Sequence, residues 1–337
     1  MLGASRLMEL SEGQVSAAVR INGELRSITT DLPADALFPI YSITKTLTAI
    51  CVLRLGEIGS LNINAAAQQW LPDVNLPDAI TVTHLLRHTS GLRDYGPLPE
   101  YHQAVRTHPD QPWTRQQFLD AVLSKGLLFA PGESWAYSNV GYMLLIDILE
   151  RVAGRTFAHV LNEFITTPLA LQRTSVAEHI DDLTGCAPGF GSELTADRHV
   201  VDVRGRYHPG WCAPRLVAST AEEITQVFDA LIAGDLLRPD TLRQMLMLVP
   251  LPGPQDAGRV IHGGMGVYSD RLSRHGRNYH HGGGGPGYDL GATVYPGTSL
   301  GRVSIAVFVN SSSGPRAEDR EALLLARLLD DPRSPSE

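Results

Sequence analysis

The order of strand-like and helix-like segments along the chain restricts its fold more than any other feature. Near the N-terminus, two strand-like runs flank the dipeptide Asn22-Gly23, which is typical of a tight hairpin turn. Helix-like runs fill the middle, and strand-like runs with glycine-rich turns return after about residue 260, before a final amphipathic helix at about 317–329. This order predicts an α/β (α+β) fold: an antiparallel sheet built from both termini and flanked by helices, with a mainly helical region inserted.

The same pattern predicts two structural parts. Residues 1–60 and 236–337 would form an α/β domain that contains the sheet, and residues 61–235 would form a mainly helical domain. A chain of 337 residues is long enough to bury a large core in this way. The functional site is expected at the junction of the two domains.

Composition argues against two classes of partner. The formal net charge is −8, so binding to a nucleic-acid backbone is not expected. No apolar run is long enough to span a bilayer, so no membrane partner is expected. The N-terminal segment MLGASRLMELSEGQ has no apolar signal core, so a cytoplasmic location is expected unless a leader was removed. The sequence does not predict an oligomeric state.

Cysteine and histidine spacing gives little sign of a disulfide framework or a metal site. Cys51, Cys186 and Cys212 lie far apart and form no C-x-x-C pair. His84 and His88 have the i, i+4 spacing of two metal ligands on one helix face, but no third ligand is evident. We therefore expect no metal and no cofactor.

Ser42 and Lys45 stand at the start of a helix-like run, 42–57, which Gly59 is expected to end. Residues three apart lie on one helix face, so Lys45 can reach the Ser42 hydroxyl. Only two of the 28 basic residues are lysines, and lysine, unlike arginine, can give up its proton and act as a base. Ser42 is therefore the predicted nucleophile and Lys45 its base. The alternative is a helix-capping serine beside a surface lysine.

Four segments of the chain, taken in order, carry a family resemblance. They are FPIYSITKTLTA, HLLRHTSGL, PGESWAYSNVGYMLLIDILERVAG and HGGGGPGY. Their order and spacing resemble the serine β-lactamase-like superfamily, most closely its class C branch, which includes D-alanyl-D-alanine carboxypeptidases, D-aminopeptidases and esterases. The resemblance covers about residues 35–310 and implies a β-lactamase/transpeptidase-like fold.

The resemblance assigns roles to the segment Tyr137-Ser138-Asn139, which matches the Y-x-N motif of this superfamily. It implies that Tyr137 shares proton transfer with Lys45, and that Asn139 forms hydrogen bonds with Lys45 and the substrate. The alternative is that Tyr137 is only a loop aromatic packed above the helix that follows.

The resemblance also assigns the third motif to His281 and the glycines after it, with the neighbouring His280 as a rival. Gly283 would let the substrate lie against the strand, and the N–H of Gly284 would bind the oxyanion opposite the N–H of Ser42. A histidine in place of the β-lactamase lysine removes a constant positive charge, which weakens the case for an efficient β-lactamase.

These residues together predict a serine hydrolase that forms an acyl-enzyme on Ser42 and cleaves a small-molecule ester or amide. Esterase activity is the first expectation, followed by a D-amino-acid peptidase or a weak β-lactamase. The alternatives are an acyltransferase using the same residues, or a non-catalytic penicillin-binding-like protein. The substrate pocket is expected to take its walls from about residues 95–113 and 190–211.

Overall fold

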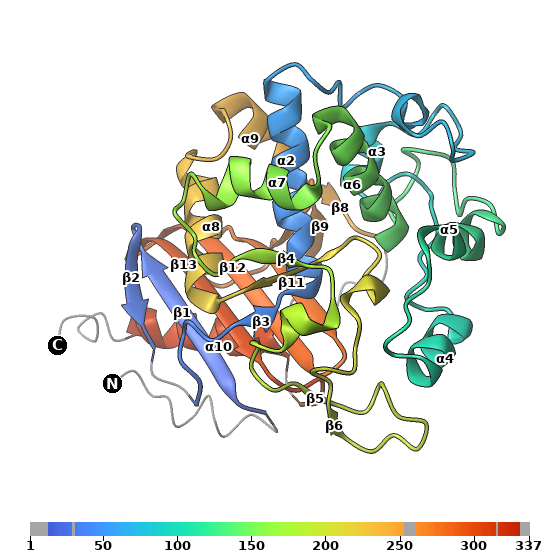
Figure 1. Cartoon of the computed structure of the whole chain (residues 1–337). Helices are drawn as coiled ribbons and strands as arrows, with labels where there is room; N and C mark the ends of the chain where they lie inside the picture. Colours follow the sequence, from blue (N-terminus) through green and yellow to red (C-terminus); the bar gives the residue numbers. More distant parts are fainter. Residues whose placement is uncertain (1–12, 29–30, 253–259, 315, 331–337) are drawn as a thin grey trace.

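The computed structural model describes residues 13–28, 31–252, 260–314 and 316–330. An eight-stranded antiparallel sheet, in the order β2-β1-β13-β12-β11-β10-β9-β8, forms its centre (Figure 1). The strands are β1 (Val15–Ile21), β2 (Glu24–Ser27), β8 (Val249–Pro250), β9 (Ile261–Gly263), β10 (Tyr268–Asp270), β11 (Tyr279–Gly285), β12 (Tyr288–Thr298) and β13 (Gly301–Val309). Strands from both ends of the chain therefore lie side by side, and the predicted fold class is confirmed.

The hairpin of β1 and β2 forms where the sequence predicts it. Asn22 has a φ of 51° and Gly23 a φ of 90°. A two-residue turn of type I′ needs positive φ at both positions, and asparagine and glycine adopt this conformation most easily. On its other edge β1 pairs with β13, so that Val15 lies opposite Val309.

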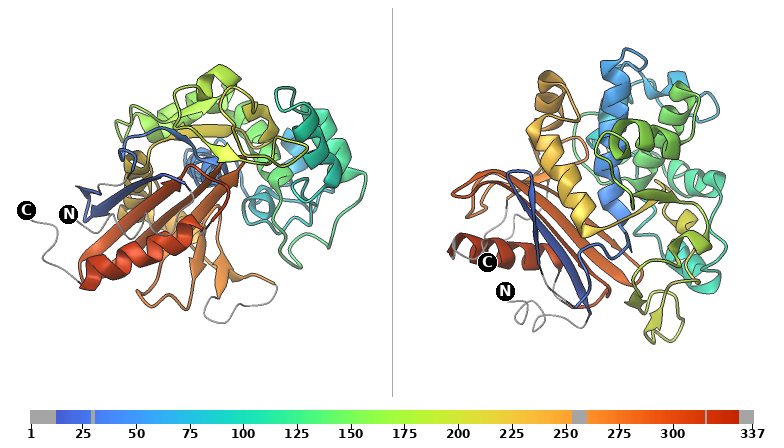
Figure 2. Two further views of the ribbon diagram at one scale, coloured as in Figure 1. Left: turned by 90° about the horizontal axis from the view of Figure 1, so that it is seen from below. Right: turned by 60° about the vertical axis from the view of Figure 1, so that its left-hand side comes forward.

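Side chains of β1 alternate between the two faces of the sheet, as the period of a strand requires. Ala17 and Val19 pack with residues of α10 (Ala317–Asp330), whereas Ala18 belongs to the larger core on the opposite face. Figure 2 shows α10 covering the first face and α8 (Ala221–Ala233) lying against the second. Both faces of the central strands are therefore buried.

The helical region packs on the face that α8 covers. Its helices are α2 (Thr44–Glu57), α3 (Val82–Leu86), α4 (Pro99–Thr107), α5 (Arg115–Leu123), α6 (Asn139–Ala153), α7 (Phe157–Leu161) and α9 (Pro239–Met245), with short strands β3 (Phe38–Pro39), β4 (Ser175–Ala177), β5 (Phe190–Gly191), β6 (Val201–Asp202) and β7 (Leu216–Ser219). One buried core joins this region to the sheet. Helix α8 falls within residues 61–235, the predicted helical domain, yet it contacts β1, β12 and β13 of the sheet. The division of the chain into two domains stays a prediction. In the described ranges, none of the helices has the length and apolar character needed to cross a bilayer.

The helix expected from Ser42 begins with a short 3₁₀ turn, η1 (Tyr41–Ile43), before α2 takes over. Its end is as expected, because Gly59 follows the helix with a φ of 77°. Apolar residues such as Leu47 and Ile50 are fully buried, and α2 contacts α6 and α7. The start of α2 is thus buried inside the molecule.

Candidate active site

Ser42, Lys45 and Tyr137, the three residues predicted to share proton transfer, lie together at the N-terminal end of α2. The Lys45 Nζ atom lies 3.1 Å from Ser42 Oγ. The Tyr137 hydroxyl donates to the same oxygen at 2.8 Å. The Ser42 hydroxyl is therefore within proton-transfer distance of both groups.

Aromatic rings hold the Lys45 side chain in place. Lys45 is only 2% exposed, and its Nζ lies 4.9 Å from the ring centre of Tyr137 and 5.8 Å from that of Tyr142. Rings at such distances attract a cation and pack against the methylene chain that carries it. The amine is thereby directed at Ser42 rather than at open solvent.

The residue before Ser42 has an unusual backbone conformation. Tyr41 has a φ of 42°, a region that costs a non-glycine residue roughly 1–3 kcal/mol. Its hydroxyl donates to the Pro286 carbonyl at 3.0 Å, and a Cβ on Gly285 would lie only 2.1 Å from its ring. These contacts hold the strained turn that presents Ser42.

Gly283 is required by the close approach of β11 to this turn. A Cβ at position 283 would lie 2.4 Å from the Ile40 carbonyl oxygen, whereas one on Gly284 would have Asp289 Oδ1, at 3.9 Å, as its neighbour. We expect Gly283→Ala to lower the free energy of unfolding by about 1–3 kcal/mol, because strand and turn must move apart. Urea denaturation measures this, with Gly284→Ala as the matched control. Equal unfolding midpoints for the two variants would contradict the explanation.

Strand alternation puts His281, rather than His280, on the face of β11 that meets the Ser42 segment. Side chains two apart share a face, and Gly283 and Gly285 are the positions where added side chains would strike residues 40–41. His281 is 3% exposed, with its ring centre 5.1 Å from that of Tyr268. Its ring is buried, and its catalytic role stays a prediction.

His88 and His281 are buried, neutral histidines near Lys45. His281 Nδ1 lies 2.7 Å from the Gly282 carbonyl, which only accepts, so Nδ1 carries the proton. His88 Nδ1 accepts the Ser138 N–H at 3.1 Å, so its proton is on Nε2. Burial, followed by the nearby positive charge of Lys45, lowers the pKa of His281 to about 3 and lowers the pKa of His88 well below its usual range.

These two histidines predict a loss of stability in mild acid. In the unfolded chain both rings take up a proton below about pH 6.5, whereas the folded state keeps them neutral, down to about pH 3 for His281. The unfolded state then binds more protons, so the free energy of unfolding falls as the pH drops through this window, by up to about 1.4 kcal/mol per pH unit for each histidine. Urea titrations between pH 7 and 5 measure the slope.

The variant His88→Gln should reduce that slope, because one of the two buried rings is then missing. His108→Gln, at an exposed position, is the matched control and should leave it unchanged. An unchanged slope in His88→Gln would show that its ring does not stay neutral in the folded state.

Asn139 turns its side chain toward Asp94, a residue that the sequence analysis did not identify. Asn139 Nδ2 donates to Asp94 Oδ2 at 3.1 Å, and the Asn139 backbone N–H donates to Asp94 Oδ1 at 2.9 Å. The hydrogen bond from Asn139 to Lys45 that the resemblance implies is not formed between these described residues. Burial raises the pKa of Asp94, an effect that the Asn139 N–H and the charge of Lys45 partly oppose.

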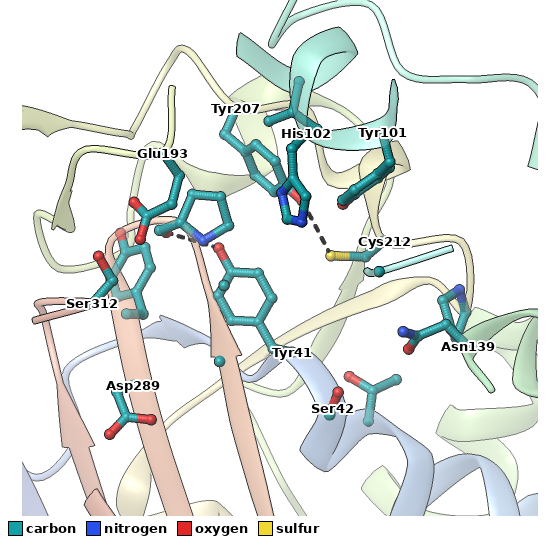
Figure 3. A pocket seen from close by; sticks show the side chains of 18 of the residues that line it. Tyr41, Ser42, Tyr101, His102, Asn139, Glu193, Tyr207, Cys212, Asp289 and Ser312 are labelled. Carbon is teal, nitrogen blue, oxygen red and sulfur yellow. Dashed lines mark hydrogen bonds between the residues drawn. The ribbon is translucent and has the colours of Figure 1, made fainter. Parts of the chain in front are cut away.

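A pocket of about 530 Å³ opens at Ser42 (Figure 3). The stretches predicted for its walls, residues 95–113 and 190–211, supply a minority of its lining, for example Tyr101 from the first and Glu193 from the second. Ser312, Ser313, Gly314 and Arg316, which come before α10, add a wall that the sequence analysis did not predict. The pocket therefore lies between the sheet, the helical region and these residues.

One end of the pocket carries the predicted nucleophile, and the other end carries an acidic side chain. Figure 3 shows Ser42 and Asn139 toward one end and Glu193 and Ser312 toward the other, with the Tyr41 ring between them. Gly284, the predicted second oxyanion donor, also lines the pocket. A substrate bound along the pocket would reach Ser42 with one end only.

His84 and His88 do not share one helix face as a pair of metal ligands would. Helix α3 ends at Leu86, and His88 lies beyond it with a φ of 57°. His84 instead caps α3, because its Nδ1 accepts the Thr81 N–H at 3.3 Å. Across the described ranges no group of three candidate metal ligands occurs. The three cysteines are free thiols.

Comparison with known proteins decides the family. The Beta-lactamase family model matches residues 7–329. The chain belongs to the beta-lactamase family. It is similar to Penicillin-binding protein 4* of Bacillus subtilis, with 29% identity over 76% of this chain and 57% of that protein. It is also similar to Esterase EstB of Burkholderia gladioli, with 32% identity over 41% of this chain and 38% of the esterase. The chain thus matches little more than half of the first relative's length and less of the second.

Solved structures share the whole architecture of this beta-lactamase family member. A D-stereospecific amidohydrolase from Streptomyces sp. matches with a TM-score of 0.80 and 25% identity, covering 95% of both chains. A D-amino acid amidase from Ochrobactrum anthropi SV3 matches with a TM-score of 0.81 and 22% identity, covering 98% of both chains. The predicted β-lactamase/transpeptidase-like fold is therefore confirmed.

Proposed function

We propose that this chain is a serine hydrolase that forms an acyl-enzyme on Ser42 and cleaves an ester or amide of a small molecule. The main support is the contact of Ser42 Oγ with both Lys45 Nζ and the Tyr137 hydroxyl. A serine hydroxyl is a weak nucleophile until a neighbouring base removes its proton. The family adds support, since relatives carry the names esterase, D-aminopeptidase and carboxypeptidase.

The reaction proceeds in two halves. Ser42 Oγ attacks the carbonyl carbon while its proton passes to Lys45, assisted by Tyr137. The N–H groups of Ser42 and Gly284 bind the resulting oxyanion. When the intermediate collapses, the bond to the leaving group breaks and the leaving group takes the proton. Water then attacks the acyl-enzyme by the same route, releases the acid and restores Ser42.

The neutral histidine at the third-motif position supports an order among the candidate substrate classes. His281 occupies the third-motif position as a neutral ring, since burial lowers its pKa to about 3. It supplies no fixed positive charge for a substrate carboxylate, so we place β-lactams and C-terminal carboxylates below uncharged esters and amides. Esters come first and amides of D-amino acids second, the latter because similar structures bear the titles amidohydrolase and amidase.

Turnover of p-nitrophenyl butyrate, D-alanine p-nitroanilide and penicillin G, combined with intact-mass spectrometry, tests this proposal. Rapid ester release through a transient adduct supports the esterase. Faster release of p-nitroaniline than of p-nitrophenol would shift the assignment to the D-amino-acid amidase. The absence of both adduct and turnover with every compound would overturn the hydrolase and leave a binding protein.

A further inference from the structure

His88 contacts three consecutive residues of the segment that carries Tyr137. The Ala136 N–H donates to the His88 carbonyl at 2.9 Å, and the Ser138 N–H donates to His88 Nδ1 at 3.1 Å. The Tyr137 ring packs on the His88 ring, with the ring centres 4.5 Å apart and the planes tilted by 32°. His88 therefore holds the backbone on both sides of Tyr137 as well as its ring.

The same histidine ring contacts Tyr142, the other aromatic side chain close to Lys45 Nζ. The ring centres of His88 and Tyr142 lie 4.9 Å apart, a distance typical of packed aromatic pairs. The Tyr142 hydroxyl donates to the Leu86 carbonyl at 2.9 Å, which fixes its ring in turn. Both rings that lie near the Lys45 amine thus pack on His88.

Two unfavourable features of His88 set it apart from an ordinary core residue. Its φ of 57° lies in the left-handed region, which a non-glycine residue occupies only where its surroundings require it. Its Nε2 carries the ring proton, because Nδ1 is an acceptor. Within the described parts of the chain this buried Nε2 has no hydrogen-bond partner, which lowers stability. Features of this kind concentrate where function requires one particular conformation.

We propose that His88 is a positioning residue, which places the Tyr137 hydroxyl at Ser42 Oγ for proton transfer. That hydroxyl donates to Ser42 Oγ at 2.8 Å, and catalysis by such a group depends steeply on its position. Among the described residues, His88 is not one of those that line the pocket. It therefore acts on the chemical step and not on substrate binding. This inference rests on the hydrolase function proposed above.

Histidine combines three properties at position 88, and two variants separate them. It adopts a positive φ more readily than most residues, its Nδ1 accepts the Ser138 N–H, and its ring packs on Tyr137. Asparagine keeps the first two, since its side-chain oxygen can replace Nδ1, whereas phenylalanine keeps only the ring. In His88→Phe the N–H of Ser138, a residue that is 1% exposed, loses its acceptor, so the segment must move.

The expected results separate kcat from KM. His88→Phe should lower kcat for p-nitrophenyl butyrate about 10- to 100-fold and leave KM within about threefold of wild type. His88→Asn should recover most of this loss. The rate of fluorophosphonate labelling should follow kcat in both variants, because it also depends on activation of Ser42. His108→Phe, at an exposed position, is the matched control and should behave as wild type.

A double-mutant cycle tests whether His88 acts through the Tyr137 hydroxyl. In the Tyr137→Phe background, which lacks that hydroxyl, His88→Phe should cause no further loss of kcat. Urea denaturation shows that each variant is folded under the assay conditions. If His88→Phe does not fold, His88→Ala removes the acceptor and the ring without adding volume, and the same results are expected of it.

The outcomes distinguish this inference from the proposed function. Equal losses from His88→Phe with and without the Tyr137 hydroxyl would overturn the positioning role, as would full activity of His88→Phe. A loss in His88→Asn as large as that in His88→Phe would also overturn it, because the bond to Ser138 would then make no difference. Wild type that gives neither adduct nor turnover would instead overturn the hydrolase itself.

Discussion

The Ser42→Ala variant is expected to lose all labelling by a fluorophosphonate and to hydrolyse p-nitrophenyl butyrate about 10⁴-fold more slowly than wild type, or slower still. The reason is that no other described group takes its place: Lys45 and Tyr137 both direct their polar atoms at Ser42 Oγ. Without that oxygen, only binding and oxyanion stabilisation remain. Intact-mass spectrometry before and after the probe measures the adduct directly.

Ser60→Ala is the matched control for this experiment, because Ser60 is an exposed serine after the end of α2. It should keep both the adduct and the turnover of wild type. A full-size adduct that persists in Ser42→Ala would locate the nucleophile elsewhere and end the acyl-enzyme proposal.

The Lys45→Arg variant is expected to lose about 10²- to 10⁴-fold in kcat/KM, the usual contribution of a general base. Arginine keeps a positive charge near Ser42 but does not release its proton in a protein. The variant therefore tests whether the positive charge at position 45 is sufficient or whether the side chain must also accept a proton. Turnover of p-nitrophenyl butyrate, with urea denaturation to check folding, measures the effect.

The second lysine of the chain provides the control. Lys125 pairs with Glu100 at 3.1 Å, and both side chains are largely exposed, so Lys125→Arg should behave as wild type. Lys45→Met, which removes the charge and keeps an unbranched chain, should be as inactive as Lys45→Arg. Activity in Lys45→Arg within a few-fold of wild type would mean that Tyr137 or another group is the base.

Sequence reasoning succeeded where the determining contacts are local. The Asn22-Gly23 turn was predictable because the backbone conformation of type I′ turns restricts their residues. The proximity of Ser42 and Lys45 was predictable because three positions along a helix bring side chains to one face. In both cases fewer than five consecutive residues carry the information.

Contacts between distant segments of the chain were predicted only from the family resemblance, or were not predicted. Tyr137 lies 95 positions from Ser42, and only the family motif pairs them. The residues around Asp94 resemble those of an ordinary loop. Its contact with the site is a hydrogen bond to Asn139, which lies 45 positions later in the chain. The strain at Tyr41 was also missed, because nothing in its neighbours along the chain requires a positive φ. Gly285 at the end of β11 and Pro286 in the turn that follows hold it.

The pairing of β1 with β13 has a consequence for the order in which the protein can be made. The Gln14 N–H bonds to the Asn310 side chain, 296 positions later, and the whole of β1 takes its inner partner from β13. While the chain is being synthesised, β1 and β2 are complete long before that partner exists. Until β13 has been made, one edge of the β1–β2 hairpin has no partner strand. The long chain segment between β1 and β13 must then be closed into a loop, which makes folding slow. The central sheet, and with it the wall of the Ser42 pocket, can therefore assemble only after residues 301–309 have been made.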